Sequence, residues 1–194
     1  MAGAGISMQI TAVDHYNDLF IVDSVFPQHL VDCVLHTDWI NLPWSPQQGQ
    51  ESWSRRRIHS EAVPWFSQWE QCLQDQWSDL ADRLGKKLKN YQGTAWWVDL
   101  PGFTCSIHTD GEMPGAMQLT WIGAPLLGTT FYHYKDANTV RHQFDMQANS
   151  GYVMINSADP QGYRHLQWHG MLEPVPVNSL RVTSYTWLTE LLSK

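Results

Sequence analysis

The stretch Ile107-His108-Thr109-Asp110-Gly111 lies just past the midpoint of the chain, at the end of an apolar run. If that run is a β-strand, side chains two residues apart lie on the same face. His108 and Asp110 could then hold one cation from one side and leave its other side open. Because His-x-Asp also occurs by chance, the pair gains meaning only if the rest of the chain supplies a third ligand and a β scaffold.

The composition is that of a folded protein and fits one domain spanning 1–194. The chain has 194 residues, with 43% hydrophobic residues, 16% charged residues and 11 Trp, which is enough to bury a sizeable core. The formal net charge of −7 argues against nucleic acid and anionic membranes as partners. No run has the apolar length of a membrane span, and 1–7 reads as a flexible lead-in rather than a signal peptide.

Cysteine usage indicates a reducing compartment. The three cysteines, Cys33, Cys72 and Cys105, are scattered and form no CxxC motif. An odd, dispersed set argues against a disulfide framework and against a zinc site built on thiolates. We therefore expect a cytoplasmic protein.

The segment 8–92 predicts one short strand and two helices. A β-prone run covers 19–22, and Pro27 precedes a helical apolar pattern. A second helix begins near Pro64, and its apolar residues recur every three or four positions, which predicts packing on a sheet. These residues are Trp65, Trp69, Leu73, Trp77, Leu80, Leu84 and Leu88. Residues 41–61 read as an exposed loop, whose run Arg55-Arg56-Arg57 is either solvated or a lip that meets an acidic substrate.

The segment 93–190 alternates short β-branched and aromatic runs with Gly, Pro, Asn and Asp. The predicted strands lie near 94–99, 103–108, 116–122, 129–134, 139–146, 151–156, 164–170 and 180–188. Many short strands at this spacing predict an antiparallel sandwich or closed barrel. The expected fold class is therefore mainly β with flanking helices at the N-terminal side.

Three histidines in the C-terminal half could complete a site with His108 and Asp110: His142, His165 and His169. Two His and one carboxylate leave open coordination positions, an arrangement that suits iron(II) used for oxygen chemistry. His142 lies among polar residues and reads as part of an edge strand. His165 and His169 would share a face if they lie on one strand, so alternation does not separate them.

Arg181 opens the last β run, and Thr183 would share its face. An inward-facing arginine in an apolar strand is costly without an anion. A bound carboxylate would explain it, because a guanidinium grips a carboxylate with two parallel donors. An Asp or Glu of the chain itself is the alternative partner.

The order His108-Thr109-Asp110, then His169, then Arg181 with Thr183 resembles the iron(II)- and 2-oxoglutarate-dependent dioxygenases, in their prolyl 4-hydroxylase-like branch. The segment His169-Gly170-Met171-Leu172-Glu173-Pro174-Val175 resembles that family after its distal His. The resemblance implies a double-stranded β-helix (jelly-roll, cupin-like) core over 93–190. It implies Fe(II) on His108, Asp110 and His169 as catalytic metal ligands, and 2-oxoglutarate bound by Arg181 and Thr183.

The implied activity is hydroxylation of a C–H bond with dioxygen, releasing succinate and carbon dioxide. The substrate would be a peptide, a protein or a small molecule. Peptidyl proline is the default substrate that the resemblance implies. Two other functions stay open. One is a cupin-like metalloenzyme that does not use 2-oxoglutarate and has no need of Arg181. The other is a non-catalytic jelly-roll that serves as a binding or structural module.

Overall fold

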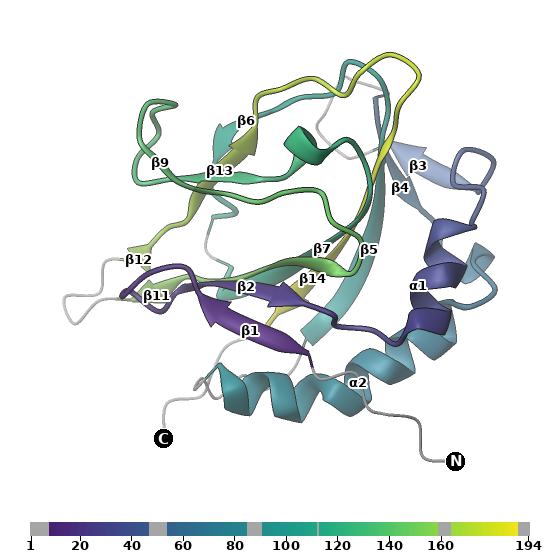
Figure 1. Cartoon of the computed structure of the whole chain (residues 1–194), viewed down its shortest axis with the longest axis horizontal. Helices are drawn as coiled ribbons and strands as arrows, with labels where there is room; N and C mark the ends of the chain where they lie inside the picture. The colour runs from purple at the N-terminus through teal and green to yellow at the C-terminus, as the bar shows by residue number, and fades with distance from the viewer. Residues whose placement is uncertain (1–7, 47–53, 85–90, 112, 159–163, 190–194) are drawn as a thin grey trace.

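The computed structural model describes residues 8–46, 54–84, 91–111, 113–158 and 164–189. Within these residues the chain forms two facing antiparallel sheets, with two helices on the outer face of the larger sheet (Figure 1). The strand spacing predicted an antiparallel sandwich or barrel, and the arrangement agrees with the jelly-roll core that the family resemblance implies. The side chains that the sequence marks as ligands lie between the two sheets.

The larger sheet has eight strands in the described residues, in the order β1-β2-β10-β7-β14-β5-β4-β3. Their bounds are β1 Gln9–Ala12, β2 Leu19–Asp23, β10 Ser150–Ile155, β7 Gly115–Ile122, β14 Arg181–Leu188, β5 Tyr91–Asp99, β4 Arg55–Ile58 and β3 Trp44–Pro46. The smaller sheet has the order β6-β13-β8-β9. Its strands are β6 Cys105–His108, β13 Trp168–Met171, β8 Thr130–Tyr132 and β9 Val140–Gln143.

The remaining elements are short except for the helices. The two helices are α1 Gln28–Leu35 and α2 Phe66–Arg83. Single 3-10 turns cover Ser60–Ala62 and Pro125–Leu127. A separate two-stranded ribbon pairs β11 Ser157–Ala158 with β12 Arg164–His165.

The two faces of the larger sheet have different roles, because side chains alternate along each strand. On β14, Val182 and Leu188 enter the core beneath the helices, whereas Arg181 and Tyr185 face the cavity between the sheets. The same alternation operates on β7, β5 and β4. Each central strand therefore contributes to the hydrophobic core with one face and to the site with the other.

Tryptophans join the helices to the larger sheet, as the predicted stripe on α2 requires. Trp69 of α2 is fully buried and stacks on Phe26 with ring centroids 4.8 Å apart. It also meets Trp96 of β5 edge-on at 5.4 Å. Trp39 stacks on Trp96 from the other side at 5.1 Å. The last member of the predicted stripe, Leu88, lies outside the described residues.

Two sequence-based assignments are wrong. The interpretation of 41–61 as an exposed loop fails where the structure describes it, because β3 and β4 pair and extend the larger sheet through β5. The run Arg55-Arg56-Arg57 is therefore a strand rather than a solvated loop. The strand predicted over 164–170 is broken into β12 and β13, which belong to different sheets.

No helix in the described part of the chain is long and apolar enough to cross a membrane. Cys33, Cys72 and Cys105 are all free thiols, as predicted from their scatter.

The aromatic contacts of Trp69 predict a large loss of stability when the side chain is removed. Trp69→Ala should lower the free energy of unfolding by about 3–5 kcal/mol, because it leaves a cavity between α2 and the sheet. Urea unfolding followed by circular dichroism measures this. The control Leu126→Ala removes a side chain that is 66% exposed and should change stability by no more than about 0.5 kcal/mol. Equal effects of the two substitutions would contradict this account of the core.

Candidate functional site

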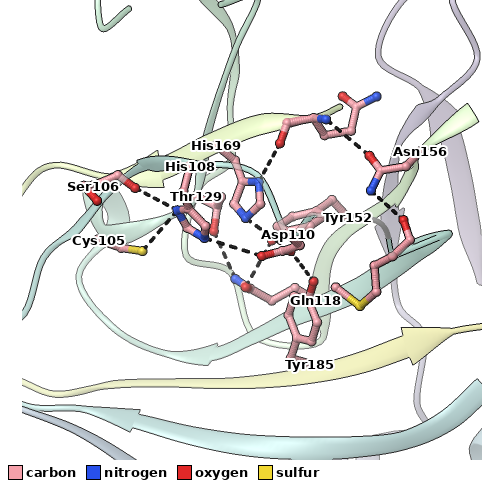
Figure 2. A network of polar contacts seen from close by, with 12 residues as sticks. Cys105, Ser106, His108, Asp110, Gln118, Thr129, Tyr152, Asn156, His169 and Tyr185 are labelled. Carbon is pink, nitrogen blue, oxygen red and sulfur yellow. Dashed lines mark hydrogen bonds and ion pairs between the residues drawn. The ribbon is translucent and has the colours of Figure 1, made fainter. Parts of the chain in front are cut away.

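Two histidines meet because β6 and β13 pair with His169 directly opposite His108. Directly opposed residues of an antiparallel pair project their side chains to the same face, and the two imidazole rings lie 4.5 Å apart (Figure 2). Gly170 lets β13 lie close to β6, since a Cβ there would come within 2.9 Å of the Cys105 carbonyl oxygen. The strand pairing thus places two imidazoles side by side.

Asp110 completes a cluster with the two histidines. It follows the end of β6, and Gly111 then turns the chain with a φ of +67°, in the left-handed region that favours glycine. One Asp110 carboxylate oxygen lies 3.5 Å from His108 Nε2 and the other lies 3.5 Å from His169 Nε2. One ligand atom from each residue lies within 4.8 Å of the others. The structure therefore brings together the three residues that the sequence marks as metal ligands.

Backbone carbonyls orient both imidazoles. The Ser106 carbonyl oxygen lies 2.7 Å from His108 Nδ1, and the Gln167 carbonyl oxygen lies 2.9 Å from His169 Nδ1. A carbonyl only accepts, so each Nδ1 carries the hydrogen and donates it. Nε2 of each ring therefore faces Asp110, and once it is unprotonated it can present its lone pair to a metal ion. Such outer hydrogen bonds fix the tautomer of metal-binding histidines.

The electrostatics of the cluster favour a cation. The hydrogen bond with Asp110 raises the pKa of His108 to about 10, whereas burial lowers the pKa of His169. Burial also acts to raise the pKa of Asp110, but the hydrogen bond from His108 and the charge of His169 hold it below its ordinary value. The carboxylate is therefore ionised, and a metal ion would displace the proton of His108.

A cavity of about 170 Å³ opens beside the cluster, between the two sheets. Its walls include Trp97, Cys105, Met113, Tyr185 and Trp187 besides the three cluster residues. The hydroxyl of Tyr185 donates a hydrogen bond to the Asp110 carboxylate (Figure 2). This bond comes from β14, so the larger sheet helps to hold the Asp110 carboxylate, which lies just after β6.

Arg181 lies in the same cavity but already has an anionic partner in the chain. Its Nη1 donates to Asp99 Oδ2 at 2.7 Å, and its Nε donates to the Leu127 carbonyl at 2.8 Å. Asp99 is completely buried, and it also accepts two hydrogen bonds from Arg55, at 2.6 and 3.0 Å. Three charged groups thus form one buried cluster, in which two guanidiniums share one carboxylate.

Thr183 shares the strand face of Arg181 and Tyr185 on β14, but it is not among the residues that line the cavity. Its hydroxyl is fully buried and has no hydrogen-bond partner among the described residues. A buried polar atom without a hydrogen-bond partner is costly. A polar chain lies nearby, in which Gln118 bonds both Thr129 and Tyr152 (Figure 2).

Other candidate residues lie elsewhere. His142 lies on β9, the edge strand of the smaller sheet, as its polar surroundings predicted. His165 lies on β12, and its side chain is outside the described part. On β7, Trp121 packs in the core with the helices and donates a hydrogen bond to the Ser184 hydroxyl, whereas Gln118 lines the cavity. Side chains alternate along β7, so Trp121 and Gln118, three residues apart, point to opposite faces of the sheet.

Sequence reasoning missed Arg55, Asp99, Tyr152 and Tyr185. Arg55 begins a run of three arginines. Because the three residues are identical, the sequence does not show which of them points toward the interior. Asp99 ends a predicted strand and had no distinguishing neighbour. Tyr185 shares the period-two face of Arg181 and Thr183, a signal that could have found it.

A second charged network supports His169 from outside the cavity. Arg141 of β9 bonds Asp14 at 2.7 Å, Asp18 at 2.6 Å and the Gln167 side chain at 2.7 Å. The Gln167 carbonyl is the group that orients His169. The loop between β1 and β2 is thereby tied to the position of a site histidine.

Solved structures share this fold. The viral collagen prolyl hydroxylase of Paramecium Bursaria Chlorella virus-1, solved as a 2OG complex, matches with a TM-score of 0.55 at 11% identity, over 90% of this chain and 96% of that chain. HygX from Streptomyces hygroscopicus, with nickel and 2-oxoglutarate bound, matches with a TM-score of 0.60 at 11% identity, over 91% and 84%. A Pseudomonas putida prolyl-4-hydroxylase gives 0.56 at 12% identity, over 90% and 94%.

These likenesses show that the chain has the fold of the 2-oxoglutarate- and iron(II)-dependent oxygenases, prolyl hydroxylases among them. No sequence-family model and no curated protein sequence matches the chain.

The Arg141 network predicts a loss of stability in acid. The hydrogen bond from Arg141 lowers the pKa of Asp14 below its ordinary 3.8 despite partial burial, and His15 acts in the same direction. Ionised Asp14 therefore stabilises the fold above about pH 4, and this contribution is lost as the pH falls through the folded-state pKa.

Asp14→Asn should cost about 1 kcal/mol of unfolding free energy at pH 7 and progressively less as the pH falls below 4. Urea unfolding at several pH values measures the difference. Asp145→Asn, which replaces an exposed carboxylate, is the control. A cost for Asp14→Asn that is the same at every pH would contradict this role for Asp14.

Proposed function

We propose that this chain is an oxygenase dependent on iron(II) and 2-oxoglutarate, which hydroxylates a C–H bond and releases succinate and carbon dioxide. The observation that carries the proposal is the cluster of His108, Asp110 and His169 beside a cavity that also contains Arg181. The fold shared with oxygenases that bind 2-oxoglutarate supports the same reading.

The donor set fits iron(II). Two imidazole nitrogens and one carboxylate leave coordination positions open, which is the ligand set typical of non-haem iron(II) oxygenases. When bound, iron(II) with dioxygen supplies the oxidising power that no amino-acid side chain has. The roles proposed for the chain are to hold the ligands through Ser106, Gln167 and Tyr185, and to screen the reacting groups from bulk water within the cavity.

The other end of the cavity fits a carboxylate. The proposed cosubstrate contacts are Arg181 and Thr183, as the resemblance implies. Arg181 supports this assignment because it lines the cavity, whereas Thr183 shares its strand face without lining the cavity, so its unpartnered hydroxyl would meet a ligand oxygen only after a local adjustment. HygX and the viral enzyme are both described with 2-oxoglutarate bound, and we propose the same cosubstrate here.

One observation favours a second candidate function, a metalloenzyme that does not use 2-oxoglutarate. Asp99 already provides the anion that an inward-facing Arg181 requires. Arg181 could then be structural, while the metal cluster serves another reaction. The Arg55–Asp99–Arg181 cluster has two positive charges and one negative charge. Its net positive charge favours the oxygenase that uses 2-oxoglutarate, because one further anion would neutralise it.

For the substrate, we propose a peptide or protein, with peptidyl proline as the first residue to test. The likeness to a viral collagen prolyl hydroxylase and to a bacterial prolyl-4-hydroxylase supports this choice. A small molecule is the alternative, since HygX was solved with hygromycin B bound. Succinate release against a panel of peptides, amino acids and small molecules separates the two.

Metal content tests the cluster. Wild-type protein incubated with iron(II) without oxygen and then desalted should retain about one iron per chain, measured by elemental analysis. Asp110→Ala and His169→Ala should each retain far less, because two ligands hold a divalent ion weakly. His142→Ala is the matched control, since that imidazole lies on the edge strand. Retention by the two site variants equal to that of His142→Ala would refute the assignment.

Succinate formation from 2-oxoglutarate under air distinguishes the two candidate functions. The wild type should produce succinate, and Arg181→Ala should raise the KM for 2-oxoglutarate by about tenfold or more. If the wild type retains iron but makes no succinate, and if Arg181→Ala leaves iron binding intact, the second candidate is favoured.

A further inference from the structure

Arg55 lines the cavity with only 14% of its side chain exposed, although its neighbours in the sequence are typical of a solvated run. Its guanidinium lies 4.3 Å from the Phe103 ring centroid and 5.4 Å from that of Trp97. It also grips Asp99 through two hydrogen bonds. Aromatic stacking and a bidentate carboxylate hold the group in one orientation.

The charges of the buried cluster do not cancel. Arg55 and Arg181 carry two positive charges, and Asp99 carries one negative charge. The guanidiniums hold the pKa of Asp99 below its ordinary value against the effect of burial, so the carboxylate stays ionised. One positive charge is left over beside a cavity, where an uncompensated charge is costly. An anion entering the cavity would balance it.

Arg55 is what makes the charge positive. Without it, Arg181 and Asp99 form a neutral pair, and an incoming carboxylate would face the negative charge of Asp99 with no compensating cation. We infer that Arg55 is a positioning residue, which offsets Asp99 so that Arg181 can bind the distal carboxylate of 2-oxoglutarate. This inference rests on the proposed function, and it gives a role to a residue outside the resemblance.

Comparison of two 2-oxo acids isolates the interaction between the arginine cluster and the distal carboxylate of 2-oxoglutarate. Pyruvate has the 2-oxo acid group that chelates a metal but lacks the distal carboxylate of 2-oxoglutarate. Binding of each to nickel-loaded protein can be followed by calorimetry, or by the fluorescence of the cavity residues Trp97 and Trp187. Arg55→Gln should weaken 2-oxoglutarate binding by about 10- to 100-fold and change pyruvate binding by less than about twofold.

Arg56→Gln is the matched control. Its guanidinium lies 4.4 Å from the Trp44 ring centroid, and the strand alternation of β4 turns it to the face opposite Arg55. It should leave the affinities for both acids unchanged. Arg55→Lys keeps the charge and should retain more of the 2-oxoglutarate affinity than Arg55→Gln. In turnover, Arg55→Gln should raise the KM for 2-oxoglutarate and leave kcat close to that of the wild type.

The double variant Arg55→Gln with Asp99→Asn separates a charge effect from damage to the fold. It leaves Arg181 as the one charged member of the cluster, so the net charge returns to that of the wild type. Its 2-oxoglutarate affinity should exceed that of Arg55→Gln alone, although it has lost two native side chains. A double variant that binds as weakly as Arg55→Gln, or more weakly, would overturn the charge-balance role of Arg55.

The outcomes distinguish this inference from the proposed function. If nickel-loaded wild type binds neither 2-oxo acid, the proposed function fails. Titration of the metal-free wild type with glutarate then decides whether the cluster is a carboxylate site at all, and Arg55→Gln should abolish any binding seen. If the wild type prefers 2-oxoglutarate to pyruvate and Arg55→Gln keeps the same preference, the inference fails and the proposed function stands.

Discussion

The antiparallel pairing of β6 with β13 is the constraint on which the site depends. It sets His169 opposite His108, although the two residues are far apart in the sequence. A slip of one residue in that register would turn one imidazole to the other face of the sheet. The close approach at Gly170 and the backbone carbonyls that hold the two Nδ1 atoms all belong to this pairing. The smaller sheet thus sets the geometry of the proposed metal site through its backbone.

The larger sheet supplies the rest of the cavity. Its strands pack against the helices with one face and line the cavity with the other. On β14, the cavity is lined by Arg181, Tyr185 and Trp187, which alternate with side chains that pack against the helices. On β4, Arg55 faces the cavity while Ile58 packs in the core with the helices. The tryptophan cluster beneath the sheet therefore fixes the strands whose opposite faces present the charged groups. Loss of core packing and loss of ligand binding are coupled through these strands.

The fold could be predicted from sequence where periodicity is strong, as on α2 and along β7, β10 and β14. The β3–β4 hairpin could not, because Pro43, Pro46 and polar residues are typical of loops, and an edge strand tolerates proline. The cluster of His108, Asp110 and His169, which we propose as metal ligands, was predicted through the order of these residues and a family resemblance. The role of Asp99 could not be predicted, since pairing two arginines on a single carboxylate depends on the tertiary arrangement of β4, β5 and β14.

We propose that the cavity has a cation site at one end and a carboxylate site at the other, so that a dicarboxylate such as 2-oxoglutarate could bind both. The most direct test of this claim is the visible absorption spectrum of the protein with iron(II) and 2-oxoglutarate in the absence of oxygen. The account predicts a weak charge-transfer band that requires both additions and is absent from Asp110→Ala. A folded wild-type protein that retains iron(II) but gives no such band at saturating 2-oxoglutarate would contradict it.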